Sequence, residues 1–246
     1  MNLLIAQSSA PAATASTQTF MLLLVAMSLL PFLLTMVTSF AKLVITLGIL
    51  RQAIGTPQIP PTSVLTGIAL ILSLHIMAPV AIDAWSRYES KARSDGVAQQ
   101  LDAVAFATSV EESLRHFLER HSDPQNVELF RGLRTRLLAD QGRANRQETP
   151  DVGMRLAQSE WQDVYDTLTI RAPAFVLTEL TRAFQIGFLL FIPFLVLDLV
   201  VSNILLAMGM HMMQPSLVSL PLKILLFVLV DGWRLLIEGI VESYVP

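Results

Sequence analysis

The stretch from Ala183 to Met213, AFQIGFLLFIPFLVLDLVVSNILLAMGMHMM, decides the fold of this chain. No charge interrupts it before Asp198, and the apolar run then resumes and continues to the methionines at its end. About 20 apolar residues are enough for a helix to cross the hydrocarbon core of a bilayer. An unpaired charge at that depth is costly, so we expect this helix to pack against other protein rather than stand alone in lipid.

The chain holds three further apolar stretches, at Phe20–Leu50, Thr62–Ile82 and Leu217–Val241. The first two are separated only by Arg51–Pro61, and such a short link predicts an antiparallel helical hairpin. Glycine and proline prevent a helix from continuing through this link, which assigns the hairpin turn to Gly55, Pro57, Pro60 and Pro61. The stretch that begins at Ala183 and the last stretch form a second hairpin, joined through Gly209 and Pro215.

A polar block separates the two apolar halves. The 246 residues are 53% hydrophobic and only 15% charged, whereas a soluble domain has about 25% charged residues. Thirteen of the 17 Lys and Arg residues, and 15 of the 20 Asp and Glu residues, lie between Arg87 and Arg182. The block is too short and too weakly apolar to bury a large core alone, so we interpret it as a helical insertion.

Three helices are expected inside the polar block. Ser109 followed by Glu112 matches a capping box, which predicts that a first helix begins there and ends near His121. Helical spacing of apolar residues over 127–137 predicts a second helix. A third is predicted over Ser159–Ile170, and Pro173 marks its end.

Six charged residues lie inside or at the ends of the apolar stretches: Lys42, Asp198, Lys223, Asp231, Arg234 and Glu238. One interpretation is a proton or ion relay. The other is structural pairing between helices and subunits, which the near balance of opposite signs favours. The last three residues fall at positions i, i+3 and i+7, on one face of a helix, where they can pair with each other.

Methionines gather in the link of the second hairpin. Met208, Met210, Met212 and Met213 surround Gly209 and His211. Methionine is unbranched and polarizable, so it fills irregular gaps and repacks around varied partners. At a loop that projects from helix ends, such a cluster could form a deformable seal. Ordinary core filling or lipid contact explains the composition equally well, so both interpretations stay open.

Composition also excludes several functional classes. The chain has no cysteine, which excludes disulfides, thiol catalysis and thiolate metal sites. Its net charge is only −3, without the basic footprint of nucleic-acid binding. The sequence contains no glycine-rich phosphate loop, HExxH motif or GxSxG motif, so we expect no enzyme, no metal and no cofactor.

A resemblance to a known family rests on ten short sequence segments. They occur in order over Met21–Tyr244, outside the polar block. They are SFAK at 39–42, GILRQAIGTP at 48–57, IPP at 59–61, MAPV at 77–80, PAFVLTEL at 173–180, AFQIGF at 183–188, IPFL at 192–195, DLV at 198–200, LPLK at 220–223 and LFVLVDGW at 226–233. In these segments the chain resembles the FliP/SctR family, the major export-gate subunit of bacterial type III secretion in flagella and injectisomes.

The resemblance implies a subunit of an assembly. Several copies, a pentamer in known members, associate with Q-type and R-type subunits into a closed helical cone, and a U-type switch subunit is a further partner. Unfolded secreted proteins pass through the central channel. The hairpins are held largely out of the bilayer plane by their partners. The implied location is the bacterial inner membrane, multi-pass, with much of the assembly on the periplasmic side.

The resemblance also implies a role for the methionines. In the family a Met-rich loop forms a gasket that keeps the resting pore closed, and by position this loop is Gly209–Met213, with Met208 directly before it. The family usually has consecutive methionines there, whereas His211 interrupts them in this chain. The departure leaves open which side chains face the pore.

The sequence therefore predicts an all-α subunit of an oligomeric export gate, in which membrane-associated helical hairpins flank a small polar insertion. We expect a disordered N-terminal lead at 1–19, with a cleaved signal as its alternative. The other expected regions are a first apolar hairpin at 20–84, a periplasmic polar insertion at 85–171 and a second apolar hairpin with the Met-rich loop at 172–246. The alternative function is a small ion or solute permease that uses Asp198 and Lys42 inside the membrane.

Overall fold

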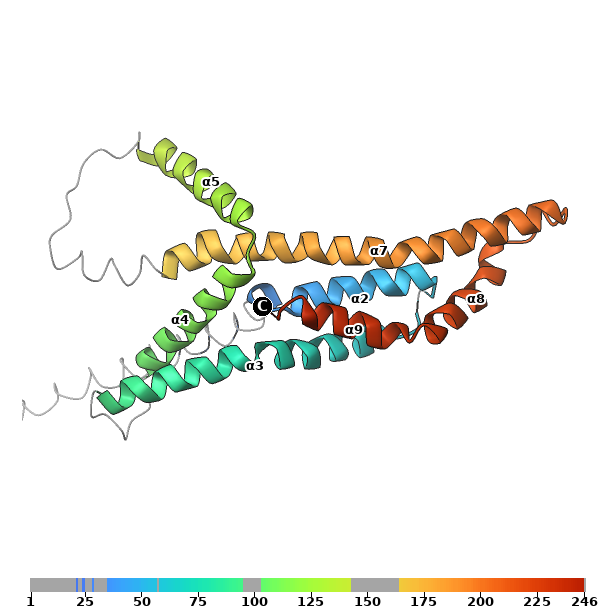
Figure 1. Cartoon of the computed structure of the whole chain (residues 1–246). Helices are drawn as coiled ribbons and strands as arrows, with labels where there is room; N and C mark the ends of the chain where they lie inside the picture. Colours follow the sequence, from blue (N-terminus) through green and yellow to red (C-terminus); the bar gives the residue numbers. More distant parts are fainter. Residues whose placement is uncertain are drawn as a thin grey trace, which may run out of the picture.

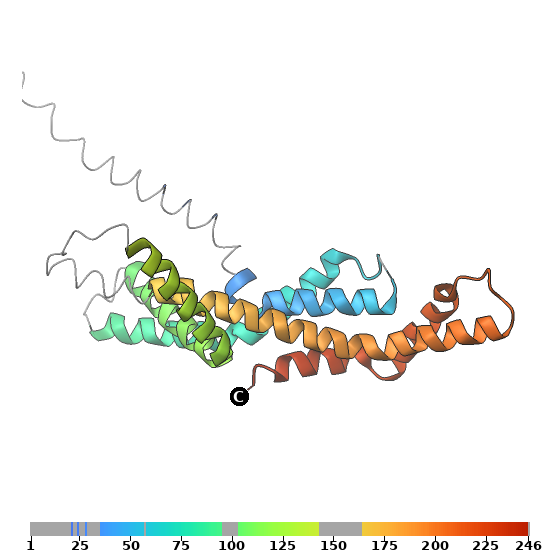
Figure 2. The same ribbon diagram turned by 90° about the horizontal axis from the view of Figure 1, so that it is seen from above.

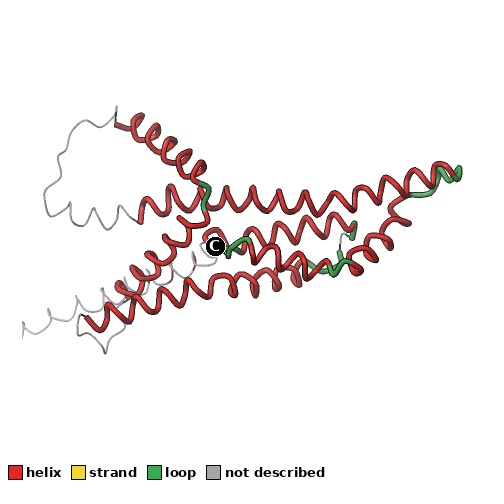
Figure 3. Tube along the Cα trace, viewed as in Figure 1, coloured by secondary structure: helices red, strands yellow, loops and turns green. Residues whose placement is uncertain are grey.

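The computed structural model describes residues 21, 24, 28, 35–56, 58–94, 103–142 and 164–245. All regular secondary structure in these residues is helical (Figure 3), which confirms the all-α prediction. The N-terminal lead expected at 1–19 lies outside the described residues, and so does Pro57 of the first turn.

Helices α2 (Phe40–Ile54) and α3 (Thr62–Ser94) form the predicted first hairpin and run antiparallel (Figure 1). α2 ends where Gly55 adopts a left-handed conformation, with φ at 89°, and its N–H donates to the Gln52 carbonyl at 3.1 Å. Glycine reaches this conformation without the steric cost of a side chain. The Pro61 carbonyl then accepts the N–H groups that open α3.

α3 is longer than predicted. The sequence predicted an end near Asp83, but the helix continues for more than two further turns. The Asp83 carboxylate accepts a hydrogen bond from Arg87, one turn later, at 2.8 Å. It accepts another, also at 2.8 Å, from Ser113 of α4 (Ala103–His121). These polar contacts stabilise a helical stretch that hydropathy alone does not predict.

The polar block contains α4 and α5 (Pro124–Gly142), and α5 occupies the position of the second predicted helix. The capping-box prediction is wrong, because α4 begins well before Ser109, whose hydroxyl donates to a carbonyl one turn back at 2.8 Å. In this added N-terminal part of the helix, Phe106 packs edge-on against Tyr88 of α3, with ring centroids 5.7 Å apart.

The third helix of the block does not end at Pro173. From Val164 the chain is continuously helical to Ala207, through a π-helical turn, η1 (Thr167–Arg171), and α7 (Ala172–Ala207). In the wide turn the Ala172 N–H donates to the Thr167 carbonyl, five residues back. A proline clashes with the carbonyl four residues before it. Here that carbonyl lies inside the wide turn, which lets the helix pass the proline without stopping.

The fourth apolar stretch, expected as one helix, is broken into α8 (Pro215–Leu229) and α9 (Gly232–Glu242). Asp231 lies at the break in a left-handed conformation, with φ at 52°. A Cβ atom on Gly232 would lie 2.3 Å from atoms of the Phe227 ring, so the ring packs directly over the glycine backbone. The left-handed residue ends the helical path of α8, so residues on the two sides of the break do not share a helix face.

The molecule is elongated (Figures 1 and 2). α4 and α5 lie at one end, and the loop that joins α7 to α8 lies at the other. α2 packs against both α3 and α7 in the body between them. The contact with α7 is close, since a Cβ on Gly187 would come within 2.5 Å of the Ile49 side chain. The buried core includes Leu43, Leu47, Leu50, Leu65, Ala69, Ile76, Phe175, Phe194, Leu236 and Ile240.

Two helices are long and apolar enough to cross a membrane, by length and composition: α3 and the helix that runs from Val164 to the end of α7. Their most apolar windows are only 22% and 17% buried within the chain. Contiguous exposed apolar surface of this kind marks a site that lipid or other protein covers. Large exposed side chains along it include Leu70, Ile71, Leu74 and Ile82 on α3, and Phe184, Phe188, Leu189, Leu195, Val196 and Leu199 on α7.

Candidate functional site: the methionine-rich loop and the buried charges

The backbone itself ends α7 at the methionine-rich loop, residues 208–213. Gly209 is left-handed, with φ at 77°. Its N–H donates to the Leu206 carbonyl at 3.0 Å, and the Met210 N–H donates to the Leu205 carbonyl at 2.9 Å. This pair of hydrogen bonds is the Schellman motif of helix C-termini. The course of the chain out of the helix is therefore set without any methionine side chain.

The side chains of the methionine-rich loop are exposed. Met212 is fully exposed and Met208 is 67% exposed, and Met210, His211 and Met213 are also in the exposed class. The loop lies at the tip of the hairpin formed by α7 and α8, at one extremity of the molecule (Figures 1 and 2; green in Figure 3). Within one chain these residues are not core residues, so any packing partner is lipid or another molecule.

A buried charge pair connects the first hairpin to α7. The side chains of Lys42 in α2 and Glu179 in α7 are 0% and 1% exposed, with Nζ and Oε2 3.5 Å apart. The Lys42 ammonium also donates to Ser243 Oγ at 2.7 Å and lies 4.3 Å from the centre of the Tyr244 ring. A carboxylate, a hydroxyl and an aromatic face thus surround the ammonium, which replaces part of its lost hydration.

The Glu179 carboxylate accepts hydrogen bonds from further groups. Arg182 donates to Oε1 at 3.2 Å, and the Tyr244 hydroxyl donates to Oε2. Arg182 also donates to the His121 carbonyl at 3.1 Å, and the His121 ring lies against Tyr244 with centroids 5.3 Å apart. We call Lys42, His121, Glu179, Arg182, Ser243 and Tyr244 the Glu179 cluster. It joins α2, α4, α7 and the residues after α9.

Tyr244 holds its proton in this cluster. Burial, together with the adjoining Glu179 carboxylate, raises the pKa of the Tyr244 hydroxyl far above its ordinary value. The hydroxyl is therefore neutral at physiological pH and remains a donor to the carboxylate. The C-terminal residues stay linked to α7 by this hydrogen bond.

A second ion pair, between a buried lysine and a half-exposed aspartate, lies at the base of the second hairpin. Lys223 of α8 is 6% exposed, and its Nζ lies 2.6 Å from Asp198 Oδ2 of α7. The same ammonium donates to the Ala53 carbonyl, in the last turn of α2, at 3.2 Å. The Ser219 hydroxyl, one turn before Lys223, also hydrogen-bonds to Asp198. One lysine therefore contacts both hairpins.

Other charges singled out in the sequence are not brought together. Lys42 and Asp198, the two residues of the permease alternative, belong to different pairs. Asp198 lies 19 residues beyond Glu179 on α7, about 28 Å along the helix at 1.5 Å per residue. The predicted shared face of the last three charges is wrong for Asp231, which lies at the break before α9. Arg234 and Glu238 approach each other to 3.8 Å on the exposed surface.

The predicted turn residues that the structure describes all lie in the link between α2 and α3. Gly55 ends α2, the Ile59–Pro60 peptide bond is cis, and Pro61 directly precedes α3. Arg51 supports the turn from one side, since its Nη1 donates to Thr62 Oγ1 at 2.9 Å.

The sequence did not single out most members of the Glu179 cluster. Glu179 carried a usable signal, because Phe175 and Ala183 lie one turn before and after it and both are buried. Helical spacing alone places the acid on that buried face. Tyr244 follows the last helix, where no periodicity places a side chain. In the described residues, no group of three or more His, Asp or Glu side chains is arranged to hold a metal ion.

Comparisons with known proteins agree with this architecture. Residues 23–240 match the model of the FliP family, which covers both hairpins and the polar block. The chain is 39% identical to the hypersensitivity response secretion protein HrcR of Ralstonia nicotianae, over 89% of this chain and 94% of the relative. It is 41% identical to the Yop proteins translocation protein R of Yersinia pestis, over 89% and 92%. It is 35% identical to the flagellar biosynthetic protein FliP of Bacillus subtilis, over 96% of each chain. The family resemblance read from the sequence is thereby confirmed, and the chain belongs to the FliP family.

Proposed function

We propose that this chain is a core subunit of the export gate of a bacterial type III secretion system, in an injectisome or a flagellum. Like copies, together with Q-type and R-type subunits, enclose a pore through which unfolded secreted proteins pass. The methionine-rich loop closes the resting pore. The observation that carries the proposal is the position of this loop, exposed at the tip of a projecting helical hairpin.

The exposed apolar helices support an assembly. α3 and α7 bury only a small part of their most apolar windows within one chain. Two acids of α7 are paired inside the chain, Glu179 with Lys42 and Asp198 with Lys223. The exposed apolar side chains of α3 and α7 are suited to contact with neighbouring subunits and lipid. The names of the relatives, which refer to secretion, translocation and flagellar biosynthesis, support the same class.

The chemistry of methionine suits a seal for a general protein conduit. A pore that passes unfolded chains of any sequence cannot rely on specific pockets. Thioether side chains adapt to varied surfaces without fixed hydrogen bonds. An apolar constriction also excludes ions when it is dewetted. A ring of loops such as 208–213, one from each copy, would supply such a constriction.

In this function the chain has no catalytic role, and other components together with the proton gradient supply the energy for export. The assembly lies in the bacterial inner membrane, with the polar block on the periplasmic side at the subunit interface and a U-type switch subunit as a further partner. The permease alternative has less support, because Lys42 and Asp198 each have their own partner. Glu179, the partner of Lys42, also lies 19 residues before Asp198 on α7.

The test is a triple change of Met210, Met212 and Met213 to alanine in the assembled gate. We expect both the unchanged chain and the variant to co-purify as an oligomer with two small hydrophobic partner proteins, and the variant alone to leak ions at rest. Met36→Ala, outside the loop, is the matched control and should not leak. An unchanged barrier in the assembled triple variant contradicts the seal. A chain that purifies as a stable monomer and binds a small solute supports the permease instead.

A further inference from the structure

The tip of the second hairpin forms an arm, which we define as Leu199–Leu222. It comprises the end of α7, the methionine-rich loop and the start of α8, and it projects beyond the first hairpin (Figures 1 and 2). Its buried side chains are few, namely Val201, Leu205 and Ser219. The position of the loop relative to the body is therefore decided at the base of the arm.

Lys223 lies at this base and links its own helix to two others. It belongs to α8, pairs with Asp198 of α7 at 2.6 Å and donates to the Ala53 carbonyl of α2 at 3.2 Å. The Lys223 Nζ also lies close under the turn, 3.9 Å from where a Cβ on Gly55 would stand. The last carbonyls of a helix carry partial negative charge, so an ammonium at the end of α2 is favourably placed.

Both helices of the arm are weakened close to this contact. Pro193 lies inside α7, five residues before Asp198, and Pro221 lies inside α8, two residues before Lys223. A proline removes one backbone hydrogen bond and is a common site of helix bending. The hairpin therefore bends most easily at the level where Lys223 fastens it to α2.

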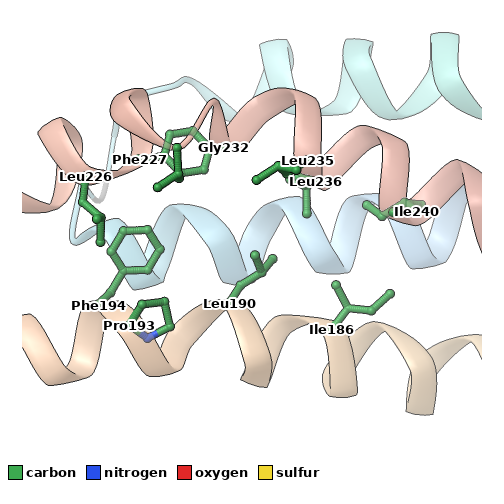
Figure 4. Close-up of a pocket in the computed structure, with 12 residues that line it drawn as sticks. Ile186, Leu190, Pro193, Phe194, Leu226, Phe227, Gly232, Leu235, Leu236 and Ile240 are labelled. Atoms are coloured by element: carbon green, nitrogen blue, oxygen red, sulfur yellow. The ribbon is translucent and has the colours of Figure 1, made fainter.

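An apolar cavity lies next to the prolines and Lys223. A cavity of about 360 Å³ lies between α7, α8 and α9, and Figure 4 shows Pro193, Phe194 and Leu226 on one part of its wall. The rings of Phe194 and Phe227 are 6.4 Å apart. Apolar contacts of this kind have no fixed direction, and the cavity leaves the rings room to shift. The ion pair and the hydrogen bond of Lys223, by contrast, have a defined distance and direction.

We propose that Lys223 is a positioning residue that fixes the angle of the arm, and with it the place of the methionine-rich loop. The proposal rests on the proposed function of that loop. The Asp198 side chain is 43% exposed, so water can still solvate its carboxylate when Lys223 is lost. The expected consequence of losing Lys223 is therefore a displaced or more widely distributed loop in a chain that still folds and assembles.

The first measurement is a distance. Because the chain has no cysteine, spin labels can be attached uniquely to Gln52→Cys at the end of α2 and Met212→Cys in the loop. Lys223→Met should shift or broaden the distribution of distances between the two labels. Lys223→Arg, which keeps a cation with several donors, should preserve most of the original distribution. Arg234→Met, which removes an exposed cation from α9, is the matched control and should leave the distribution unchanged.

The second measurement is the resting ion leak of the complete gate in vesicles. Lys223→Met should increase the leak severalfold while the oligomer stays intact, and Arg234→Met should not. An unchanged distance distribution, or an unchanged barrier in the assembled Lys223→Met gate, overturns the proposal. If Lys223→Met does not assemble, the distance distribution in the purified full chain decides.

The triple methionine variant separates this inference from the proposed function. If that variant does not leak, the seal itself is wrong. If it leaks while Lys223→Met keeps the original distance distribution and barrier, the seal stands and only the role of Lys223 fails.

Discussion

The side chains of Lys42 and Glu179 lie out of contact with water, and each makes the charge of the other tolerable there. Moving a single ion from water to a protein interior costs several kcal/mol even after relaxation. The Glu179 cluster offsets this cost with the aromatic face and the hydroxyl of Tyr244 and with Ser243 Oγ. Such a site tolerates the loss of both charges better than the loss of one.

Single and double changes of this pair therefore differ. Glu179→Gln should lower the free energy of unfolding by about 3–5 kcal/mol, because the Lys42 charge stays buried without its carboxylate. Lys42→Met should cost less, because Arg182 still pairs with Glu179. Lys42→Met combined with Glu179→Leu should recover most of that loss. Denaturant unfolding of the purified chain in detergent measures both effects.

The control for this prediction is Arg234→Met, whose ion pair with Glu238 is exposed. It should change the unfolding free energy by no more than about 0.5 kcal/mol. A single change at Lys42 or Glu179 with an effect as small as that of the control would contradict the assignment of a buried, mutually dependent pair.

Individual residues were predictable where they contrast with their surroundings. Lys42, Asp198 and Lys223 stand out because each charge interrupts an apolar run. Their partners were harder to identify, since pairing depends on which helices meet. Glu179 lies in a mixed stretch, and the periodicity around it gives its burial but not its partner. The Ala53 carbonyl, which Lys223 contacts, leaves no mark in the sequence at all.

At the scale of helices, the ends that depend on local chemistry agree with the sequence, and the ends that depend on tertiary contacts do not. Gly55 stops α2 as predicted, because the left-handed conformation is a local property of glycine. The break at Asp231 is accompanied by packing of the Phe227 ring directly on Gly232. The helix across Pro173 requires a π turn. Neither arrangement is encoded in a pattern of spacing.

The end of α7 can be tested at Gly209. A Cβ there meets no atom within 4 Å, so a substitution strains only the backbone. Gly209→Ala should reduce stability by about 1 kcal/mol, while Gly209→Asn should be milder because asparagine tolerates the left-handed conformation. Thermal unfolding of the two variants provides the comparison. Equal stability of the unchanged chain and both variants would show that the left-handed stop is unimportant.

The contact between α2 and α7 can be tested at Gly187. A Cβ there would approach Ile49 Cδ1 to 2.5 Å, so Gly187→Ala should reduce stability by about 1–3 kcal/mol through overpacking. Adding Ile49→Ala should relieve the clash, which a double-mutant cycle measures as coupling. Gly48→Ala is the matched control, because its Cβ meets nothing within 4 Å and alanine favours a helix. Additive effects of the changes at Gly187 and Ile49 would argue against this contact.

At the scale of the whole molecule, the two hairpins were predictable because long apolar runs and short glycine- and proline-containing links are strong signals. What covers the outer surfaces was not predictable from spacing, since a lipid-facing helix and a subunit-facing helix have the same composition. The sequence segments shared with the FliP/SctR family predicted an assembly of several subunits. The structure adds that α3 and α7 are exposed along most of their apolar length.

The outer surface of α7 provides the corresponding test. Phe184 and Phe188 are 61% and 68% exposed, one turn apart on the helix. Changing both to serine should leave the unfolding free energy of the single chain in detergent nearly unchanged, because neither side chain is buried within it. The same change should weaken assembly into the oligomer, as native electrophoresis of the purified complex would show. Normal assembly of the double variant would mean that this surface faces lipid.

The glycine stop at the end of α7 has one more consequence. Main-chain hydrogen bonds alone form the turn after α7, so the side chains of the methionine-rich loop do not contribute to its shape. Their chemical character can be exchanged, from thioether to aromatic or aliphatic, on an unaltered template. The width and apolar character of the proposed pore should thus be adjustable without changing the scaffold that carries the loop.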